Sequence, residues 1–275
     1  MSEKNNRVAV VTGASKGVGK GIALGLADSG ATVYTTARSE QALNETVAEI
    51  NRRGGKGIAI VCDHHDDEQV KAVFDRVMTD CGRLDILVNN VFIVHDDLIS
   101  EKKFWEKPLS VWDMVDIGTR SHYVAGVYAA QIMTQQKFGL IANTSGFGGR
   151  DYRYDVAYGV GKAGTDRMAI DMGVELEPFN VAAVSLCLGM VKTERTLQAL
   201  SNPDAFFSKF DLSKSETAEF PGRILAAMIE DPDLMRHTSK VLITAELGLE
   251  YDIVDIDGSR PVSLREQLGG PVWND

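Results

Sequence analysis

The chain has 275 residues, of which 44% are hydrophobic and 25% are charged. Its 29 basic and 39 acidic residues leave a formal net charge of −10, which opposes binding to nucleic acid or to an anionic membrane surface. The sequence shows no apolar leader of the secretory kind and no run of roughly 18 apolar residues, the length that spans a bilayer. We therefore expect a cytoplasmic protein with no nucleic-acid or membrane partner.

The residue types that bind metals are not spaced as metal ligands. Three cysteines, Cys62, Cys81 and Cys187, are an odd number far apart in the chain, which favours reduced thiols over a disulfide framework. The run His64-His65-Asp66-Asp67 is more typical of a solvated loop than of a metal site, because adjacent side chains rarely point at one ion. We expect no bound metal.

Strand-like and helix-like segments alternate along most of the chain. Short apolar runs predict strands at 7–12, 31–36, 57–62, 85–89, 140–144, 181–187 and 240–243. Helical spacing of apolar residues predicts helices at 18–29, 41–53, 68–80, 110–136, 156–177 and 215–230. Continuous apolar strands separated by helices indicate a parallel sheet buried on both faces. We therefore expect one α/β domain of Rossmann type over residues 1–275, with a doubly wound parallel sheet of about seven strands and helices on both faces.

Three segments interrupt this alternation. Residues 91–109 and 193–214 each follow a strand end, where ligands bind in this architecture. We expect 193–214 to be a substrate loop. The C-terminal extension, residues 247–275, has no clear periodicity and no role that the sequence indicates.

A glycine-rich turn joins the first strand to the first helix. Residues 12–19 read T-G-A-S-K-G-V-G, and their missing side chains let the backbone turn sharply and approach a pyrophosphate, which the helix N-terminus attracts. The alternative is a glycine-rich loop with no ligand. The cofactor-binding candidates here are Gly13, Ser15, Lys16, Gly17, Val18 and Gly19.

The end of the second strand indicates which nicotinamide cofactor is preferred. A site for NAD places Asp or Glu here to bind the ribose 2′-hydroxyl, whereas this chain has Arg38. Arg38 can bind a 2′-phosphate through two hydrogen bonds, and Lys16 adds a second positive charge. We therefore predict NADP(H), although an ordinary solvated arginine is the alternative.

Ser145 and a Tyr-x-x-x-Lys pair form the candidate catalytic group. Tyr158 and Lys162 are four residues apart in a predicted helix and so share one face. A nearby cation stabilises a phenolate, so Lys162 would lower the pKa of Tyr158, which then gives or takes a proton while Ser145 holds the substrate oxygen. By itself, such a pair is more often a half-buried helix face.

The order of the glycine turn, Asp63, Asn89-Asn90, Ser145 and Tyr158-x-x-x-Lys162 resembles the short-chain dehydrogenase/reductase family over nearly the whole chain. The resemblance implies hydride transfer between NADP(H) and a carbonyl or secondary alcohol substrate. It also implies a homodimer or homotetramer that pairs through helices 110–136 and 156–177. The cofactor-binding residues that it adds are Asp63 at the adenine, Asn89 beside the cleft, Tyr158, Lys162 at the ribose, and Gly189, Val191 and Thr193 toward the nicotinamide.

The chain departs from the family pattern at three positions. Gly118 stands where many members have an Asn that holds a water, Phe92 stands for the glycine of N-N-A-G, and Leu188 stands for the proline of P-G. We interpret these changes as a remodelled active site. The alternatives are an inactive NADP(H)-binding regulator of the same fold, or a different Rossmann-type enzyme such as a methyltransferase.

Overall fold

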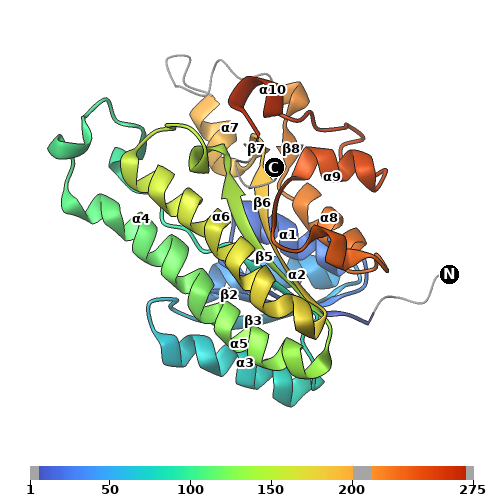
Figure 1. Ribbon diagram of the computed structural model, residues 1–275. Helices are drawn as coiled ribbons and strands as arrows, with labels where there is room; N and C mark the ends of the chain where they lie inside the picture. Colours follow the sequence, from blue (N-terminus) through green and yellow to red (C-terminus); the bar gives the residue numbers. More distant parts are fainter. Residues whose placement is uncertain (1–5, 201–211, 271–275) are drawn as a thin grey trace.

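Seven parallel strands form the central sheet of the computed structural model, which describes residues 6–200 and 212–270. The strands lie in the order β3-β2-β1-β4-β5-β6-β9, and every neighbouring pair is parallel. The predicted doubly wound sheet is therefore confirmed (Figure 1). The strands are β1 (Val8–Thr12), β2 (Thr32–Ala37), β3 (Lys56–Val61), β4 (Ile86–Asn89), β5 (Gly139–Gly146), β6 (Val181–Leu188) and β9 (Lys240–Ile243).

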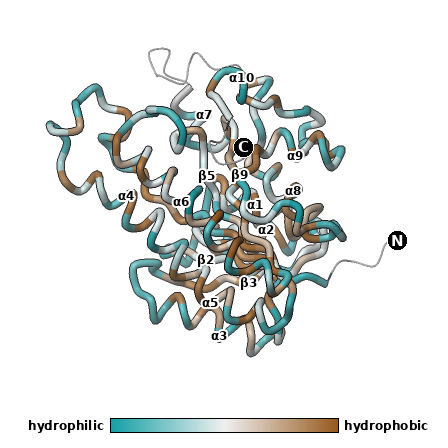
Figure 2. Tube along the Cα trace, viewed as in Figure 1, coloured by the Kyte–Doolittle hydropathy of each residue, from teal (hydrophilic) through white to brown (hydrophobic). Residues whose placement is uncertain are grey.

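Helices cover both faces of this sheet. They are α1 (Gly17–Asp28), α2 (Glu40–Arg52), α3 (Asp67–Cys81), α4 (Asp113–Val115), α5 (Ser121–Gln136), α6 (Val156–Leu176), α7 (Glu194–Leu200), α8 (Phe220–Met228), α9 (Thr244–Glu250) and α10 (Arg265–Leu268). Figure 2 shows hydrophobic residues concentrated in the central strands and hydrophilic residues along the outer helices. None of the described helices is long and apolar enough to cross a membrane.

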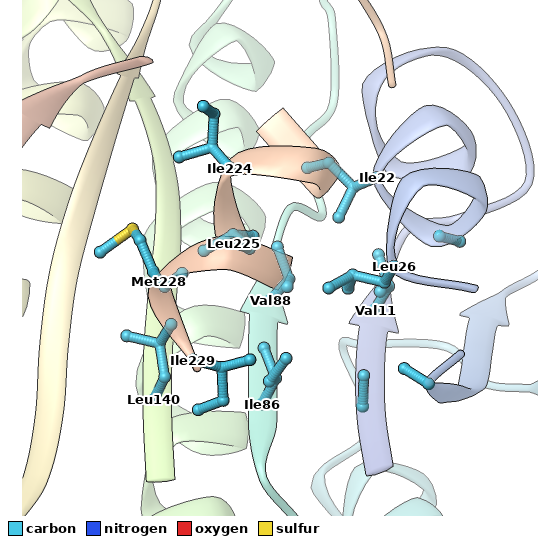
Figure 3. Packing of buried hydrophobic residues seen from close by; sticks show 14 of the residues in the cluster. Val11, Ile22, Leu26, Ile86, Val88, Leu140, Ile224, Leu225, Met228 and Ile229 are labelled. Atoms are coloured by element: carbon cyan, nitrogen blue, oxygen red, sulfur yellow. The ribbon is translucent and has the colours of Figure 1, made fainter. Parts of the chain in front are cut away.

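Two hydrophobic clusters hold these layers together. One joins α1 and α8 to the sheet, and Figure 3 shows Ile229, the residue after α8, beside Ile86 of β4, and Leu26 of α1 beside Val11 of β1. The other joins α3, α5 and α6 to the opposite face through residues such as Val77. Burial from both sides explains why the strands read as continuous apolar runs rather than as alternating ones.

Helix α6, which carries the candidate Tyr and Lys, begins at a well-defined point. The Asp155 side chain accepts a hydrogen bond from the backbone N–H of Ala157 at 2.7 Å, which satisfies a free donor in the first turn. Asp155 also forms a buried ion pair with Lys107 at 2.6 Å, so the segment before α4 is tied to the start of α6. These contacts orient the Tyr158 face of the helix.

The predicted helix at 110–136 is wrong in its first part. The chain forms a 3₁₀ turn at Leu109–Trp112, the short α4, a π-helical turn at Asp116–Arg120, and then α5. The π turn contains Gly118, whose missing side chain leaves room for a ring from another segment. Bulges of this kind insert one residue and often lie at functional sites.

The predicted helix at 215–230 is also too long. Residues Glu216–Thr217 form strand β8, which pairs in parallel with β7 (Val191–Lys192), and α8 begins only at Phe220. Pro221 lies in the first turn of α8, where its missing N–H costs nothing. Part of the predicted substrate loop, residues 201–211, lies outside the described residues, as does the end of the C-terminal extension, residues 271–275.

Candidate functional site

The glycine turn lies where β1 ends and α1 begins. Gly13 has a φ of +66°, a left-handed conformation that side chains disfavour. A Cβ on Gly19 would lie 2.4 Å from the carbonyl oxygen of Gly13, so the turn closes against the helix with no room for a side chain. Ser15 and Val18 are half-buried in the same turn. The turn therefore leaves a backbone surface at a helix N-terminus, which fits a pyrophosphate.

Asn90 braces this turn from the neighbouring strand. Its side-chain Nδ2 donates to the carbonyl oxygens of Thr12 at 3.1 Å and Gly13 at 3.2 Å. Asn89 instead lies fully buried and donates to the carbonyl of His122 and to Asn143 of β5. Of the two asparagines, Asn90 is therefore the one that shapes the turn, which the sequence reasoning did not single out.

Two basic side chains are exposed beside the turn. Lys16 lies within it, and Arg38 follows β2. Asp63 lies at the end of the neighbouring β3, and a hydrogen bond from the backbone of His65 lowers its pKa, with a smaller contribution from the charge of Arg38. The structure thus brings Arg38 and Asp63 to the same end of the sheet.

Tyr158 and Lys162 project from α6 toward the end of β5. Lys162 Nζ donates to the carbonyl oxygen of Thr144 at 3.3 Å and lies 5.8 Å from the centre of the Tyr158 ring. A Cβ on Gly146 would lie 3.4 Å from the Tyr158 hydroxyl, which places that hydroxyl at the residue after Ser145. Ser145 lies inside β5 rather than after it.

Burial changes the acidity of both groups. Removal from water raises the pKa of Tyr158 above its usual value of 10, because the phenolate loses hydration. The same effect lowers the pKa of Lys162 to about 8, because the ammonium loses hydration. The Ser145 hydroxyl is buried and interacts with the Asp166 carboxyl, whose pKa it lowers. The site therefore holds a buried hydroxyl beside a tyrosine and a lysine.

Phe92 occupies the space that Gly118 leaves. A Cβ on Gly118 would lie 2.9 Å from a carbon of the Phe92 ring. Lys162 Nζ lies 4.8 Å from the centre of that ring, and the Phe92 and Tyr158 rings meet edge to face at 6.0 Å. The two departures from the family pattern are thus complementary, since the glycine admits the ring that covers the lysine.

Asp166 is a further buried group on the same face of α6, one turn beyond Lys162. It accepts a hydrogen bond from the Ser185 hydroxyl of β6 at 2.6 Å and is 6% exposed. Burial raises its pKa, whereas the hydroxyls of Ser185 and Ser145 and the charge of Lys162 lower it. The helical spacing 158, 162, 166 was a signal for this residue in the sequence.

The segment after β6 reaches back to the glycine turn. A Cβ on Gly17 would lie 3.8 Å from the methyl group of Thr193, so the two segments lie side by side. Gly189 donates its N–H to the Glu216 side chain at 2.8 Å, and Val191 pairs with Glu216 in the small β7–β8 sheet. The sequence analysis missed Glu216 because it assigned that residue to a helix.

Three histidines near these strand ends have structural partners. His64 is buried, with Nε2 2.7 Å from Thr36 Oγ1, so the expected solvated loop is wrong at this residue. His95 Nε2 lies 3.1 Å from Ser110 Oγ, and His122 Nε2 lies 3.2 Å from the Val91 carbonyl oxygen. The described residues contain no cluster of three or more His, Cys, Asp or Glu side chains that could hold a metal ion.

Comparison with known proteins places the chain among oxidoreductases. The family model for short chain dehydrogenase matches residues 7–204. The chain is 40% identical to Dehydrogenase/reductase SDR family member 1 of Mus musculus, covering 98% of this chain and 89% of the relative. It is 30% identical to a 3-oxoacyl-[acyl-carrier-protein] reductase of Synechocystis sp., covering 74% of this chain and 81% of the relative.

Solved structures agree with the family model. A short-chain type dehydrogenase/reductase from Mycobacterium marinum superposes with a TM-score of 0.75 at 25% identity, covering 88% of this chain and 94% of that chain. A putative gluconate dehydrogenase from Agrobacterium tumefaciens superposes with a TM-score of 0.77 at 22% identity, covering 88% of this chain and 95% of that chain. The second likeness, at such low identity, concerns the fold.

Proposed function

Because the chain belongs to the short-chain dehydrogenase/reductase family, we propose that it transfers a hydride between NADP(H) and a carbonyl or secondary alcohol substrate. The observation that carries the proposal is the convergence of Tyr158, Lys162 and the buried hydroxyl of Ser145 at the end of β5. A helix face that served packing alone would have no need of a lysine and a tyrosine beside a buried hydroxyl.

The residues around the glycine turn fit the cofactor. Gly13, Gly17 and Gly19 leave a cradle that side chains would fill, and Lys16 and Arg38 are exposed beside it. In the proposed complex these two bases bind the 2′-phosphate, which favours NADP(H) over NAD(H). Asp63 binds the adenine edge, while Gly189, Val191 and Thr193 bind the nicotinamide end and Lys162 the ribose.

The proposed chemistry divides between the cofactor and three side chains. Bound NADP(H) supplies or accepts the hydride. Ser145 donates a hydrogen bond to the substrate oxygen and orients it. Tyr158 gives that oxygen a proton in the reductive direction and removes one in the oxidative direction. Lys162, charged below its pKa of about 8, stabilises the phenolate that Tyr158 becomes after it gives up its proton.

An inactive NADP(H)-binding regulator is the second candidate function. The observation that favours it is the raised pKa of Tyr158, together with the Phe92 ring that covers Lys162. A tyrosine with a raised pKa stays protonated near neutral pH and can hardly accept a proton, unless positive charge on the bound cofactor lowers that pKa. Turnover separates the two candidates, because a regulator binds NADPH without oxidising it.

The test is oxidation of NADPH with a panel of aldehydes, ketones and quinones. Replacing Tyr158→Phe removes the proton donor with little change in shape, and we expect a loss of about 100-fold or more in kcat/KM. Tyr152→Phe is the control, because the Tyr152 side chain is 75% exposed. A panel member that is reduced equally fast by the Tyr158→Phe variant would overturn the mechanism, and the absence of any turnover would favour the regulator.

Location and assembly complete the proposal. The three cysteines are free, which suits the reducing cytoplasm. Apolar side chains are exposed on the outer faces of the two long helices, Tyr123 on α5 and Val160 on α6. We therefore propose a cytoplasmic homodimer or homotetramer that pairs through α5 and α6.

A further inference from the structure

A carboxyl group is buried behind the segment that follows β6. Glu216 lies in β8 and is 1% exposed. One of its oxygens accepts the backbone N–H of Gly189 at 2.8 Å, and the other accepts the hydroxyl of Thr244, at the start of α9, at 2.6 Å. Its own backbone N–H donates to the carbonyl oxygen of Met190 at 3.1 Å. Side chain and backbone of one residue thus hold two consecutive residues of this segment.

The held segment faces the glycine turn. Residues 189–193 run from the end of β6 through β7, and Thr193 lies opposite Gly17. The β7–β8 pairing adds Val191 and Lys192 to the residues whose position depends on β8. A displacement of Glu216 would therefore move the whole segment that runs from Gly189 to Thr193.

The C-terminal extension braces Glu216 from the other side. Asp255 accepts hydrogen bonds from both the N–H and the hydroxyl of Thr217, each at 2.7 Å. Val262 N donates to the Lys214 carbonyl oxygen at 3.1 Å. The extension, for which the sequence indicated no role, therefore anchors β8 on both sides of Glu216.

A buried carboxyl is a costly way to fill this position. Burying a charged group without a cation is unfavourable, and the described partners of Glu216 are the neutral Gly189 N–H and Thr244 hydroxyl. Burial raises the pKa of Glu216 to about 7, to which the charge of Asp255 adds. The Cys187 thiol of β6 also has a raised pKa, mainly because it is buried and in part because of the charge of Glu216. An apolar residue would pack here at no such cost but would leave the Gly189 N–H without an acceptor.

We propose that Glu216 is a positioning residue for the nicotinamide end of NADP(H), because it holds the Gly189 N–H and so sets the course of residues 189–193 along the cleft. The inference rests on the proposed function. Glu216 acts on the nicotinamide half of the cofactor and does not contact the adenine half, which the glycine turn and Arg38 bind. This separation supplies the test.

The experiment compares two ligands by calorimetry: NADPH, and 2′-phospho-ADP-ribose, which has the adenine half and the pyrophosphate but no nicotinamide. For Glu216→Leu, which leaves the Gly189 N–H without an acceptor, we expect the Kd for NADPH to rise about tenfold. The Kd for 2′-phospho-ADP-ribose stays within about twofold of that of the unaltered protein. Asp252→Asn is the control, because it breaks an exposed ion pair with Arg260 within the C-terminal extension, and exposed pairs contribute little.

Glu216→Gln separates the charge from the acceptor. Its amide oxygen accepts the Gly189 N–H, so we expect NADPH affinity to return to within about threefold of the unaltered protein. In the unaltered protein, the ratio of the two Kd values shifts in favour of NADPH as pH rises through about 7 and the carboxylate forms, since a carboxylate is the stronger acceptor. In Glu216→Gln this ratio is independent of pH.

Three results would overturn the inference. They are an equal loss of affinity for both ligands in Glu216→Leu, unchanged NADPH affinity in that variant, and a ratio of the two Kd values that still depends on pH in Glu216→Gln. The last result decides the matter even where the leucine variant fails to fold. Failure of the proposed function is recognised separately: NADPH binding without turnover removes the enzymatic proposal and leaves this inference standing, whereas the absence of NADPH binding in the unaltered protein removes both.

Discussion

The two ends of the candidate site are built in different ways. The end formed by residues 12–19 with Arg38, here called the glycine end, is made of backbone and exposed bases. The end formed by Phe92, Gly118, Tyr158, Lys162 and residues 189–193, here called the catalytic end, consists mostly of half-buried residues, and Phe92, Tyr158 and Lys162 contact one another. The glycine end keeps the family pattern, whereas the departures Phe92 and Gly118 lie at the catalytic end.

The difference teaches how each end tolerates change. Where backbone packs against backbone, a glycine cannot be replaced, because even a single Cβ would collide with a carbonyl oxygen. Where side chains pack against side chains, two residues can change together. The Phe92 ring, for example, fills the space that Gly118 leaves. We therefore expect single substitutions to cause large losses of binding and stability at the glycine end and smaller losses at the catalytic end.

The largest effect is expected from Gly19→Ala, which would break the glycine end. The new Cβ would lie 2.4 Å from the Gly13 carbonyl oxygen, so we expect a loss of about 1–3 kcal/mol in stability. Displacement of the turn would weaken NADPH binding by about 100-fold. Gly164→Ala in α6 is the control, because its nearest neighbour, a methyl of Thr119, would lie at an ordinary 3.5 Å. Urea unfolding and calorimetry measure both quantities, and equal behaviour of the two variants would remove the distinction.

Arg38→Ala tests the exposed charge at the same end. We expect NADPH affinity to fall about 30-fold, the effect of losing charge-assisted hydrogen bonds, while NADH affinity stays the same. Arg52→Ala is the control, because that side chain is 72% exposed on neighbouring α2 and pairs only weakly, at 3.9 Å, with Glu49. A protein that binds NADH as tightly as NADPH before any substitution would contradict the proposed cofactor preference.

Asp166→Asn tests the buried charge at the catalytic end. The negative charge of Asp166 raises the pKa of Lys162, which burial lowers to about 8. Activity that needs the charged lysine falls as pH rises through that pKa, so the variant should lose activity at a lower pH, with a loss of about tenfold at pH 8. The pH profile of kcat/KM is the measurement, and Asp171→Asn on the exposed side of α6 is the control. An unshifted alkaline limb would show that Asp166 does not act through Lys162.

The smallest effect is expected at the Phe92 and Gly118 pair. Gly118→Ala alone should destabilise the protein, because its Cβ would meet the Phe92 ring at 2.9 Å, but should be tolerated in a Phe92→Ala background. We expect a coupling free energy of about 1 kcal/mol from urea unfolding of the four proteins. The same cycle with Gly164→Ala should be additive. Additivity in both cycles would mean that the exchange at these two positions is not compensatory.

Much of the fold follows from local signals in the sequence. The apolar runs and helical spacing placed all seven strands of the central sheet to within a few residues. The two helices that were predicted wrongly each contain a segment whose conformation depends on tertiary contacts. The π turn around Gly118 accommodates the Phe92 ring, and β8 forms only because β7 lies beside it. Neither partner lies within one helix length of the segment that it changes.

Short-range patterns were sufficient to identify the glycine turn and the Tyr158–Lys162 face, because each is a property of a few neighbouring residues. The partners of that face were decided by the tertiary structure. In the sequence, Asp166 and Glu216 look like two more acidic residues among 39, of the kind that a solvated helix carries. The folded chain buries both, one against Ser185 and the other against Gly189, and burial is what gives a carboxyl group its shifted pKa and its hold on a neighbour.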